Sequence, residues 1–179
     1  RDANTLSRRG VQSVCLPLTE IGKLSPKLPN TSDISALIFT SRHAVLAFVD
    51  CMESSDWRRI PVFVVGKATA AIAREMGFVI IYAGSGGGAG LVPTILKHLP
   101  AMQGRILWPA AVDRSFDMAS ALKAHGYDVE TRKIYVAQPR VNFTADELQQ
   151  LCQGNVSGVI VMSARSARLF CQLLNDYNL

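Results

Sequence analysis

The sequence predicts an α/β protein in which two parallel-sheet domains are joined by a two-stranded β connector. Short apolar runs alternate along the 179 residues with amphipathic segments. Two polar, extended segments lie far apart in the sequence and can pair with each other. One strand-and-helix unit also occurs twice. Alternating strands and helices with short connections are typical of parallel sheets covered by helices.

The strands are expected where short runs are rich in apolar and β-branched residues. Such runs occupy residues 11–17, 34–41, 61–66, 78–83, 104–110, 128–137 and 158–164. Most of them are apolar throughout, as buried parallel strands are. The run 128–137 (DVETRKIYVA) instead alternates polar and apolar residues, so we expect it to be half exposed.

The helices are expected in the amphipathic segments between these runs. The segments span residues 44–53, 68–76, 90–99, 116–125, 144–152 and 166–176. Gly77, Gly126 and Gly154 follow three of them, where a left-handed C-cap favours glycine. Thr144 and Glu147 have the spacing of a capping box, which predicts a helix start at this point.

The strand-and-helix unit that occurs twice spans residues 36–48 (ALIFTSRHAVLAF) and 158–170 (GVIVMSARSARLF). In each copy an apolar run ends at a serine, an arginine follows within two residues, and an amphipathic stretch ends in phenylalanine. The two serines are Ser41 and Ser163. The spacing between the copies is far longer than the period of a solenoid, so it suggests duplicated domains.

The connector is expected between the polar segment PLTEI (17–21) and the half-exposed run 128–137. Their pairing makes residues 21–134 an inserted α/β domain. The first domain is then discontinuous, with residues 1–16 plus 140–179, and residues 17–20 and 135–139 form the connector strands. Because the two flanks contain too few elements for a full sheet, we expect the first domain to be incomplete in this chain.

Composition and charge narrow the class of protein. No apolar run approaches the roughly 20 residues of a membrane-spanning helix, and the polar start RDANTLSRRG lacks the apolar core of a signal peptide. We therefore expect a soluble, cytoplasmic protein with no membrane partner. The net charge of +5 comes from dispersed basic residues, which argues against nucleic-acid binding and suits a polyanionic small molecule.

No metal or organic cofactor is expected. The four cysteines and three histidines are scattered, without CxxC or metal-ligand spacing, which favours buried structural thiols. The run GSGGGAG (84–90) follows a strand and precedes a helix, as a dinucleotide-binding loop does. Its spacing is unspecific, and Asp113 is a poor match for the acidic residue that contacts the ribose. A flexible loop or an anion cradle is the favoured interpretation.

Candidate ligand contacts lie at the carboxyl ends of the expected strands, where ligands bind in parallel α/β sheets. Hydroxyl groups and basic side chains beside helix N-termini suit anions. Ordinary helix capping is the competing interpretation for any single serine or threonine. The candidates are Thr40, Ser41, Arg42, Gly66, Lys67, Thr69, Ser163, Ala164 and Arg165.

Tyr135 is the candidate proton donor. It lies in the expected connector. A phenol has a pKa of about 10, so it is neutral at pH 7 and can donate a proton. The competing interpretation is that Tyr135 only packs within its strand.

Several segments resemble the uroporphyrinogen-III synthase family, and together they extend over nearly the whole chain. The segments 37–45 (LIFTSRHAV) and 159–170 (VIVMSARSARLF) resemble that family's two Thr-Ser elements. The segment 64–78 (VVGKATAAIAREMGF) resembles its VG-x-x-TA signature, and 104–139 resembles the stretch that leads to its second linker. The segment 16–21 (LPLTEI) resembles its first linker. One departure is Met-Ser-Ala at 162–164, where Thr-Ser-Pro is commoner.

The resemblance implies two flavodoxin-like domains and a cyclising lyase of haem and tetrapyrrole biosynthesis. Such enzymes close hydroxymethylbilane to uroporphyrinogen III, with loss of water and inversion of ring D, without a cofactor, and can act as monomers. Tyr135 resembles the family's linker tyrosine, which is proposed to assist the departure of water. Ser41, Thr69 and Ser163 match hydroxyl positions of the cleft, and Arg42 and Lys67 suit the substrate's carboxylates. The alternative is a non-catalytic flavodoxin-like protein that binds a tetrapyrrole or nucleotide.

Overall fold

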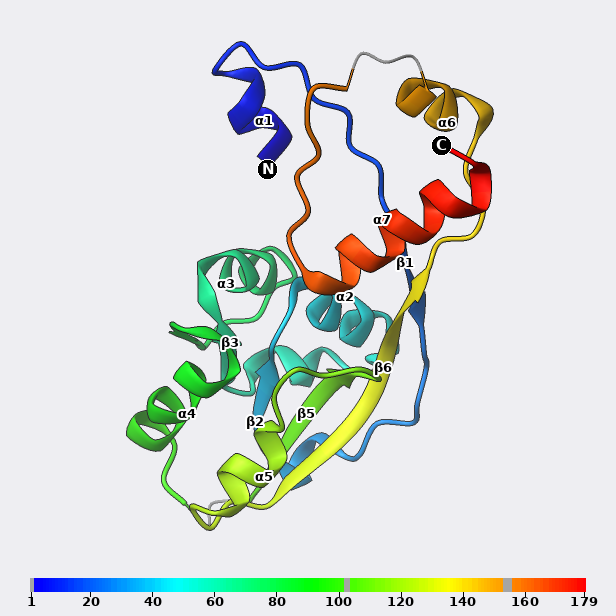
Figure 1. Cartoon of the computed structure of the whole chain (residues 1–179). Helices are drawn as coiled ribbons and strands as arrows, with labels where there is room; N and C mark the ends of the chain where they lie inside the picture. Colours follow the sequence, from blue (N-terminus) through cyan, green and yellow to red (C-terminus); the bar gives the residue numbers. More distant parts are fainter. Residues whose placement is uncertain (1, 102–103, 153–155) are drawn as a thin grey trace. The chain divides into compact units, whose positions relative to one another are not determined.

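A six-stranded sheet with helices on both faces confirms the predicted α/β fold class (Figure 1). This computed structural model describes residues 2–101, 104–152 and 156–179. The strands are β1 (Thr19–Lys23), β2 (Ile34–Phe39), β3 (Val62–Val65), β4 (Ile81–Gly84), β5 (Arg105–Ala111) and β6 (Val129–Pro139). Their order in the sheet is β1-β6-β5-β2-β3-β4. The pairs from β6 across to β4 are all parallel.

The helices occupy the amphipathic segments that the sequence indicates, with ends that differ by a few residues. They are α2 (Arg42–Cys51), α3 (Gly66–Glu75), α4 (Gly87–His98), α5 (Met118–Lys123), α6 (Ala145–Cys152) and α7 (Ala164–Tyr177). Gly77 and Gly126 have φ angles of 88° and 83°, as left-handed C-caps require. Gly154 lies outside the described residues. The chain also forms a short helix α1 (Asp2–Ser7) and the 3-10 turns η1 (Thr31–Asp33) and η2 (Ser55–Arg59).

The core lies on the two faces of the sheet. On one face, Leu37 and Phe39 of β2 pack with residues of α2 and α3. On the other face, Ala36 and Ile38 of the same strand pack with residues of α4 and α5. All four of these β2 side chains are fully buried. Apart from Ser35, the strand is therefore apolar, because it has a helical layer on each side.

The expected pairing of the two connector segments is present, as the β1–β6 pair. The backbone N–H of Leu24 donates to the carbonyl of Ile134, and that of Arg140 donates to the carbonyl of Leu18. The later residue of one strand thus pairs with the earlier residue of the other, so the two strands are antiparallel. Both strands belong to the six-stranded sheet. Against the expected residues 17–20, β1 begins two residues later and continues to Lys23, and β6 begins six residues before the expected 135–139.

The chain divides into two compact units. The first comprises residues 1–20 with 138–179, and the second comprises residues 21–137. Within the first unit, Arg140 makes hydrogen bonds of 2.7 Å to both carboxylate oxygens of Glu147. The backbone N–H groups of Thr144 and Glu147 each donate to the other's side chain, which confirms the capping box. The Arg140 guanidinium, followed by the Thr144 backbone, lowers the pKa of Glu147 to about 2.

The prediction of two strands in the first unit is wrong. Residues 11–17 and 158–164 form no strand, and the helix α7 begins already at Ala164. A β-strand is stabilised by hydrogen bonds to a neighbouring strand, and the described part of the chain places no strand beside either segment. Their apolar side chains are therefore exposed, with Val14 at 68% and Met162 at 76%.

The expectation of buried thiols is also wrong. Cys15, Cys152 and Cys171 are exposed and Cys51 is half-buried, and all four are free. Their apolar sequence neighbours do not bury them, because Cys15 lies in a segment without regular secondary structure and Cys171 is at an exposed position of α7. Among the described residues, no helix is both long and apolar enough to cross a membrane.

Candidate functional site

Ser41 and Tyr135 form a hydrogen-bonded pair at the carboxyl edge of the sheet in the second unit. The Ser41 Oγ and the Tyr135 Oη are 2.8 Å apart. Ser41 follows β2 and is the N-cap of α2, where its Oγ accepts from the Ala44 backbone N–H at 3.0 Å. Tyr135 is buried, with 8% of its surface exposed. The sequence named both residues as candidates, and the structure brings these two together.

The pair retains one hydroxyl proton for another acceptor. Each hydroxyl has one proton and can accept hydrogen bonds as well. The bond between Ser41 and Tyr135 uses one of the two protons, and the Ala44 N–H occupies only an acceptor site on Ser41. Whichever residue donates within the pair, the O–H of the other remains available. A leaving oxygen at this edge could therefore receive a proton from the pair.

A register shift in β6 turns Tyr135 towards α2. Ala110 pairs with Lys133, but the next residue, Ala111, pairs with Tyr135, so Ile134 is the extra residue of a β-bulge. Successive residues of a regular strand point to opposite faces. Here Ile134 and Tyr135 both belong to the core on the α2 side. The bulge thus places the phenol on the face that carries Ser41.

The reach of Tyr135 depends on the strand between it and Ser41. In the sheet order, β5 lies between β6 and β2. The β5 residue opposite Tyr135 is Ala111, whose small side chain contacts the same core cluster. An alanine at this position leaves room for the phenol ring to extend across β5 to Ser41.

Residues next to Ser41 complete the end of β2. Thr40 is half-buried and follows the last strand residue, Phe39, and Arg42 is the exposed first residue of α2. The N-terminus of this helix is already capped by Ser41. Arg42 can therefore contribute a mobile positive charge at this edge, while Ser41 is engaged by the helix and by Tyr135.

The neighbouring helix α3 begins without such a cap. It follows β3 directly, and its N-cap, Val65, provides no side-chain hydrogen bond. Gly66 has a φ angle of 76°, Lys67 is exposed, and Thr69 is buried with 5% exposure. Uncapped N–H groups at a helix start, with a lysine beside them, favour an anion. This helix start suits a carboxylate better than that of α2.

In the first unit, Ser163 repeats the geometry of Ser41. Its φ and ψ angles are −158° and 155°, against −156° and 161° at Ser41. Each serine Oγ accepts the backbone N–H three residues later at 3.0 Å. The Ser163 hydroxyl also bonds to the Ser166 hydroxyl, at 2.9 Å. Ala164 is exposed and Arg165 is half-buried in the first turn of α7.

The glycines at 84–90 are explained by a tight turn between β4 and α4. A Cβ atom on Gly90 would lie 1.6 Å from the Ser85 carbonyl oxygen, and one on Gly88 would lie 2.8 Å from the Phe116 ring. Gly86 and Gly87 have φ angles of 78° and 76°. Close packing and left-handed backbone conformation therefore account for these glycines without a bound nucleotide.

Gly90→Ala is expected to lower the free energy of unfolding by about 3 kcal/mol, because the new methyl group overlaps a backbone carbonyl that has to move. Gly87→Ala is the matched control, since its Cβ would have no atom within 4 Å. Gly87→Ala should lower the free energy of unfolding by about 1–2 kcal/mol, the usual cost of a left-handed backbone conformation for a residue with a Cβ atom. Urea denaturation of both variants measures the difference. Equal losses would show that the turn can shift to accept a Cβ at Gly90.

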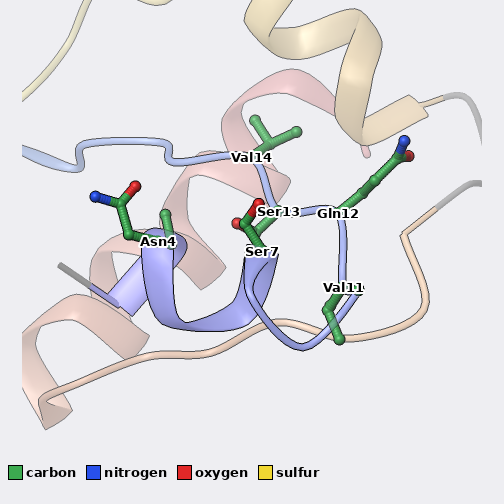
Figure 2. Close-up of a pocket in the computed structure, with 8 residues that line it drawn as sticks. Asn4, Ser7, Val11, Gln12, Ser13 and Val14 are labelled. Carbon is green, nitrogen blue, oxygen red and sulfur yellow. The ribbon is translucent and has the colours of Figure 1, made fainter.

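A recess of ≈ 610 Å³ lies elsewhere, beside α1 in the first unit (Figure 2). The lining residues come from the single stretch between Ala3 and Val14 and contain no acidic or basic side chain. Hydroxyl and amide groups at Ser7, Ser13 and Asn4 supply its polarity. This recess offers no group that could exchange a proton at neutral pH, so we do not assign it to the site.

His43 is a neighbour of the pair that the sequence did not single out. Its ring centroid is 6.1 Å from that of Tyr135, with a tilt of 49° between the planes. Its position, two residues after the capping Ser41, was the available signal. That position did not indicate a contact with Tyr135, because the two residues are 92 positions apart in the chain and only the fold brings them together.

Comparisons with known proteins agree on one family. The family model described as uroporphyrinogen-III synthase HemD matches residues 1–179. The chain is similar to the solved uroporphyrinogen-III synthetase of Helicobacter pylori 26695, with 20% identity, a TM-score of 0.65, and coverage of 88% of this chain and 70% of that one. It is also similar to a mutant uroporphyrinogen III synthase of the extremely thermophilic bacterium Thermus thermophilus, with 15% identity, a TM-score of 0.52, and coverage of 76% and 57%. At these identities the two structures show a shared fold.

Proposed function

Because this chain belongs to the uroporphyrinogen-III synthase family, we propose that the protein closes hydroxymethylbilane to uroporphyrinogen III. The reaction is a cyclising dehydration in tetrapyrrole biosynthesis. Since the chain spans part of each solved synthase that it resembles, the activity is proposed for the whole protein. The observation that carries the proposal is the hydroxyl pair of Ser41 and Tyr135, at an edge where ligands bind in parallel α/β folds.

The pair has a defined task in the proposed chemistry. The C–O bond of the terminal hydroxymethyl group breaks, and the departing oxygen takes the available proton of the pair and leaves as water. The lone pair of the adjacent pyrrole nitrogen stabilises the cation that remains. The substituted carbon of ring D then attacks that cation to form a spiro intermediate. Rearrangement inverts ring D, and the proton that ring D loses on closure restores the pair.

Substrate binding would use the basic and uncapped groups of the same edge. The bilane carries eight carboxylates, so several anion contacts are needed at once. The uncapped start of α3 with Lys67 supports one such contact, and the exposed Arg42 supports another. Thr40, Gly66 and Thr69 adjoin these groups in the chain. Holding the bilane in a reactive shape can contribute about 7–11 kcal/mol to lowering the barrier.

The first unit contains a second set of candidate carboxylate-binding residues. We assign Ser163, Ala164 and Arg165 to carboxylate binding, because this segment resembles the family's second Thr-Ser element and Arg165 places a positive charge in the first turn of α7. The two compact units would be the two domains of the enzyme, with the division near residues 21 and 137. Replacing Arg165 should then raise KM more than it lowers kcat.

A coupled assay tests the function. The full-length protein is mixed with freshly generated hydroxymethylbilane, the products are oxidised, and the porphyrin isomers are separated. Enzymatic closure should give isomer III, whereas spontaneous closure gives isomer I. Isomer I alone, at the rate seen without protein, would contradict the proposal. Saturable binding of the bilane without isomer III would instead indicate a non-catalytic tetrapyrrole-binding protein.

A further inference from the structure

The first turn of α2 contacts Tyr135 at two points. The N-cap Ser41 bonds to the phenol hydroxyl at 2.8 Å. His43, the second residue of the helix, lies against the phenol ring with a centroid distance of 6.1 Å. Because Ser41 and His43 belong to the same helix start, they have a fixed separation. Together they define both the end and the plane of the Tyr135 side chain.

Tyr135 is buried in the core cluster beside α2, and His43 is an aromatic neighbour of its ring. On β5 the opposing residue is Ala111, which is small. A single hydrogen bond at the hydroxyl leaves rotation of the ring about its long axis open. An aromatic side chain against the ring restricts that rotation. His43 is the residue that makes this contact.

The neutral form of the His43 imidazole is favoured over the charged form. Burial lowers its pKa, and the charge of the adjacent Arg42 lowers it further. The positive end of the α2 dipole acts in the same direction on a histidine in the first turn. A neutral ring can pack on Tyr135 without placing a second cation beside Arg42.

We infer that His43 is a positioning residue that packs on the ring of Tyr135 and holds the phenol hydroxyl on Ser41. It acts through Tyr135 and not on the substrate. Its kinetic consequence rests on the proposed function, whereas its effect on the Tyr135 ring does not. A misplacement of about 1 Å in a reacting group can cost about 100-fold in rate, so a residue that fixes this ring matters for turnover.

The test compares three variants of the full-length protein. His43→Ala removes the ring, and His43→Phe restores a ring that cannot titrate. His98→Ala is the matched control. His98 is on α4, and its ring stacks on that of another tyrosine, Tyr82, with 4.5 Å between the ring centroids. Each variant is assayed for kcat, KM and the isomer III to isomer I ratio. The ring signals of carbon-13-labelled tyrosines are recorded by NMR, with Tyr135 assigned through Tyr135→Phe.

The expected result separates positioning from folding. In His43→Ala the kcat falls by about 5–10-fold with KM within about twofold, and the share of isomer I rises. The Tyr135 ring signal shifts or broadens, and His43→Phe restores both the rate and the signal. His98→Ala changes the Tyr82 signal and leaves the kinetics unchanged.

Two outcomes would overturn the inference. One is an unchanged Tyr135 signal in His43→Ala. The other is a His43→Phe variant as slow as His43→Ala, which would mean that the imidazole itself takes part. If the wild-type protein gives no isomer III but the Tyr135 signal responds as expected, the positioning role stands and the proposed function fails.

Discussion

Replacing Tyr135 with phenylalanine is expected to lower the rate of isomer III formation about 100-fold, the lower end of the usual contribution of a general acid. The low end is expected because the pyrrole nitrogen already makes the hydroxymethyl group a good leaving group. The ring and its packing on His43 remain, so KM should change little. Loss of the hydrogen bond to Ser41 should lower the free energy of unfolding by only about 1 kcal/mol. The isomer assay and a urea denaturation curve measure the two effects.

Tyr127→Phe is the control for this experiment. Tyr127 is as buried as Tyr135, with 6% exposure, and its hydroxyl donates to the Leu99 carbonyl. It packs in the core on the opposite face of the sheet, with residues of α4 and α5. The control should lose similar stability and keep its activity. If Tyr135→Phe also keeps its activity, the hydroxyl is not the proton donor and the role of Tyr135 is limited to packing.

Phe48→Ala is expected to lower the free energy of unfolding by about 3–5 kcal/mol, the usual range for a buried phenylalanine. Phe48 is fully buried on the inner side of α2. It packs edge-to-face with Phe39 at 5.4 Å and with Trp57 at 5.2 Å. Truncation to alanine leaves a cavity between the helix and the sheet. Thermal or urea unfolding, followed by circular dichroism, measures the loss.

Leu46→Ala on the same helix provides the comparison. Leu46 is 39% exposed, so its truncation should cost about 0.5 kcal/mol or less. Both variants place alanine in the helix, so a difference of several kcal/mol between them reports the buried contacts of Phe48 and not helix propensity. A loss in Phe48→Ala that is no larger than in Leu46→Ala would mean that α2 is held by other contacts. The position of Ser41 and His43 would then not depend on this part of the core.

Local patterns in the sequence predicted the elements of the second unit because each is a local property. A buried strand such as β2 is almost entirely apolar, and Gly77 is needed where a helix ends in the left-handed region. The segment 158–164 is similarly rich in apolar residues, so a strand was expected there, but the prediction was wrong. An apolar run becomes a strand only when a neighbour accepts its hydrogen bonds, and composition does not report the neighbour.

The site was only partly accessible from the sequence for a related reason. Ser41, Thr69 and Tyr135 could be named as separate candidates from their residue types and from the resemblance. That Ser41 and Tyr135 bond to each other depends on strand order, on the small Ala111 between them, and on the register of β6. These are long-range properties, and His43 acquires its meaning only from them. The roles of the individual site residues stay predictions until the variants are measured.

The bulge at Ile134 makes the chemistry depend on how residues pair as well as on their identity. If the strand kept every residue but lacked the bulge, Ala111 would pair with Ile134, and Tyr135 would point towards the α4 side with every side chain of the site still encoded. The bond between the phenol and Ser41 therefore depends on the register of β6. Substitutions at its exposed positions, Arg132 and Lys133, should leave that register unchanged.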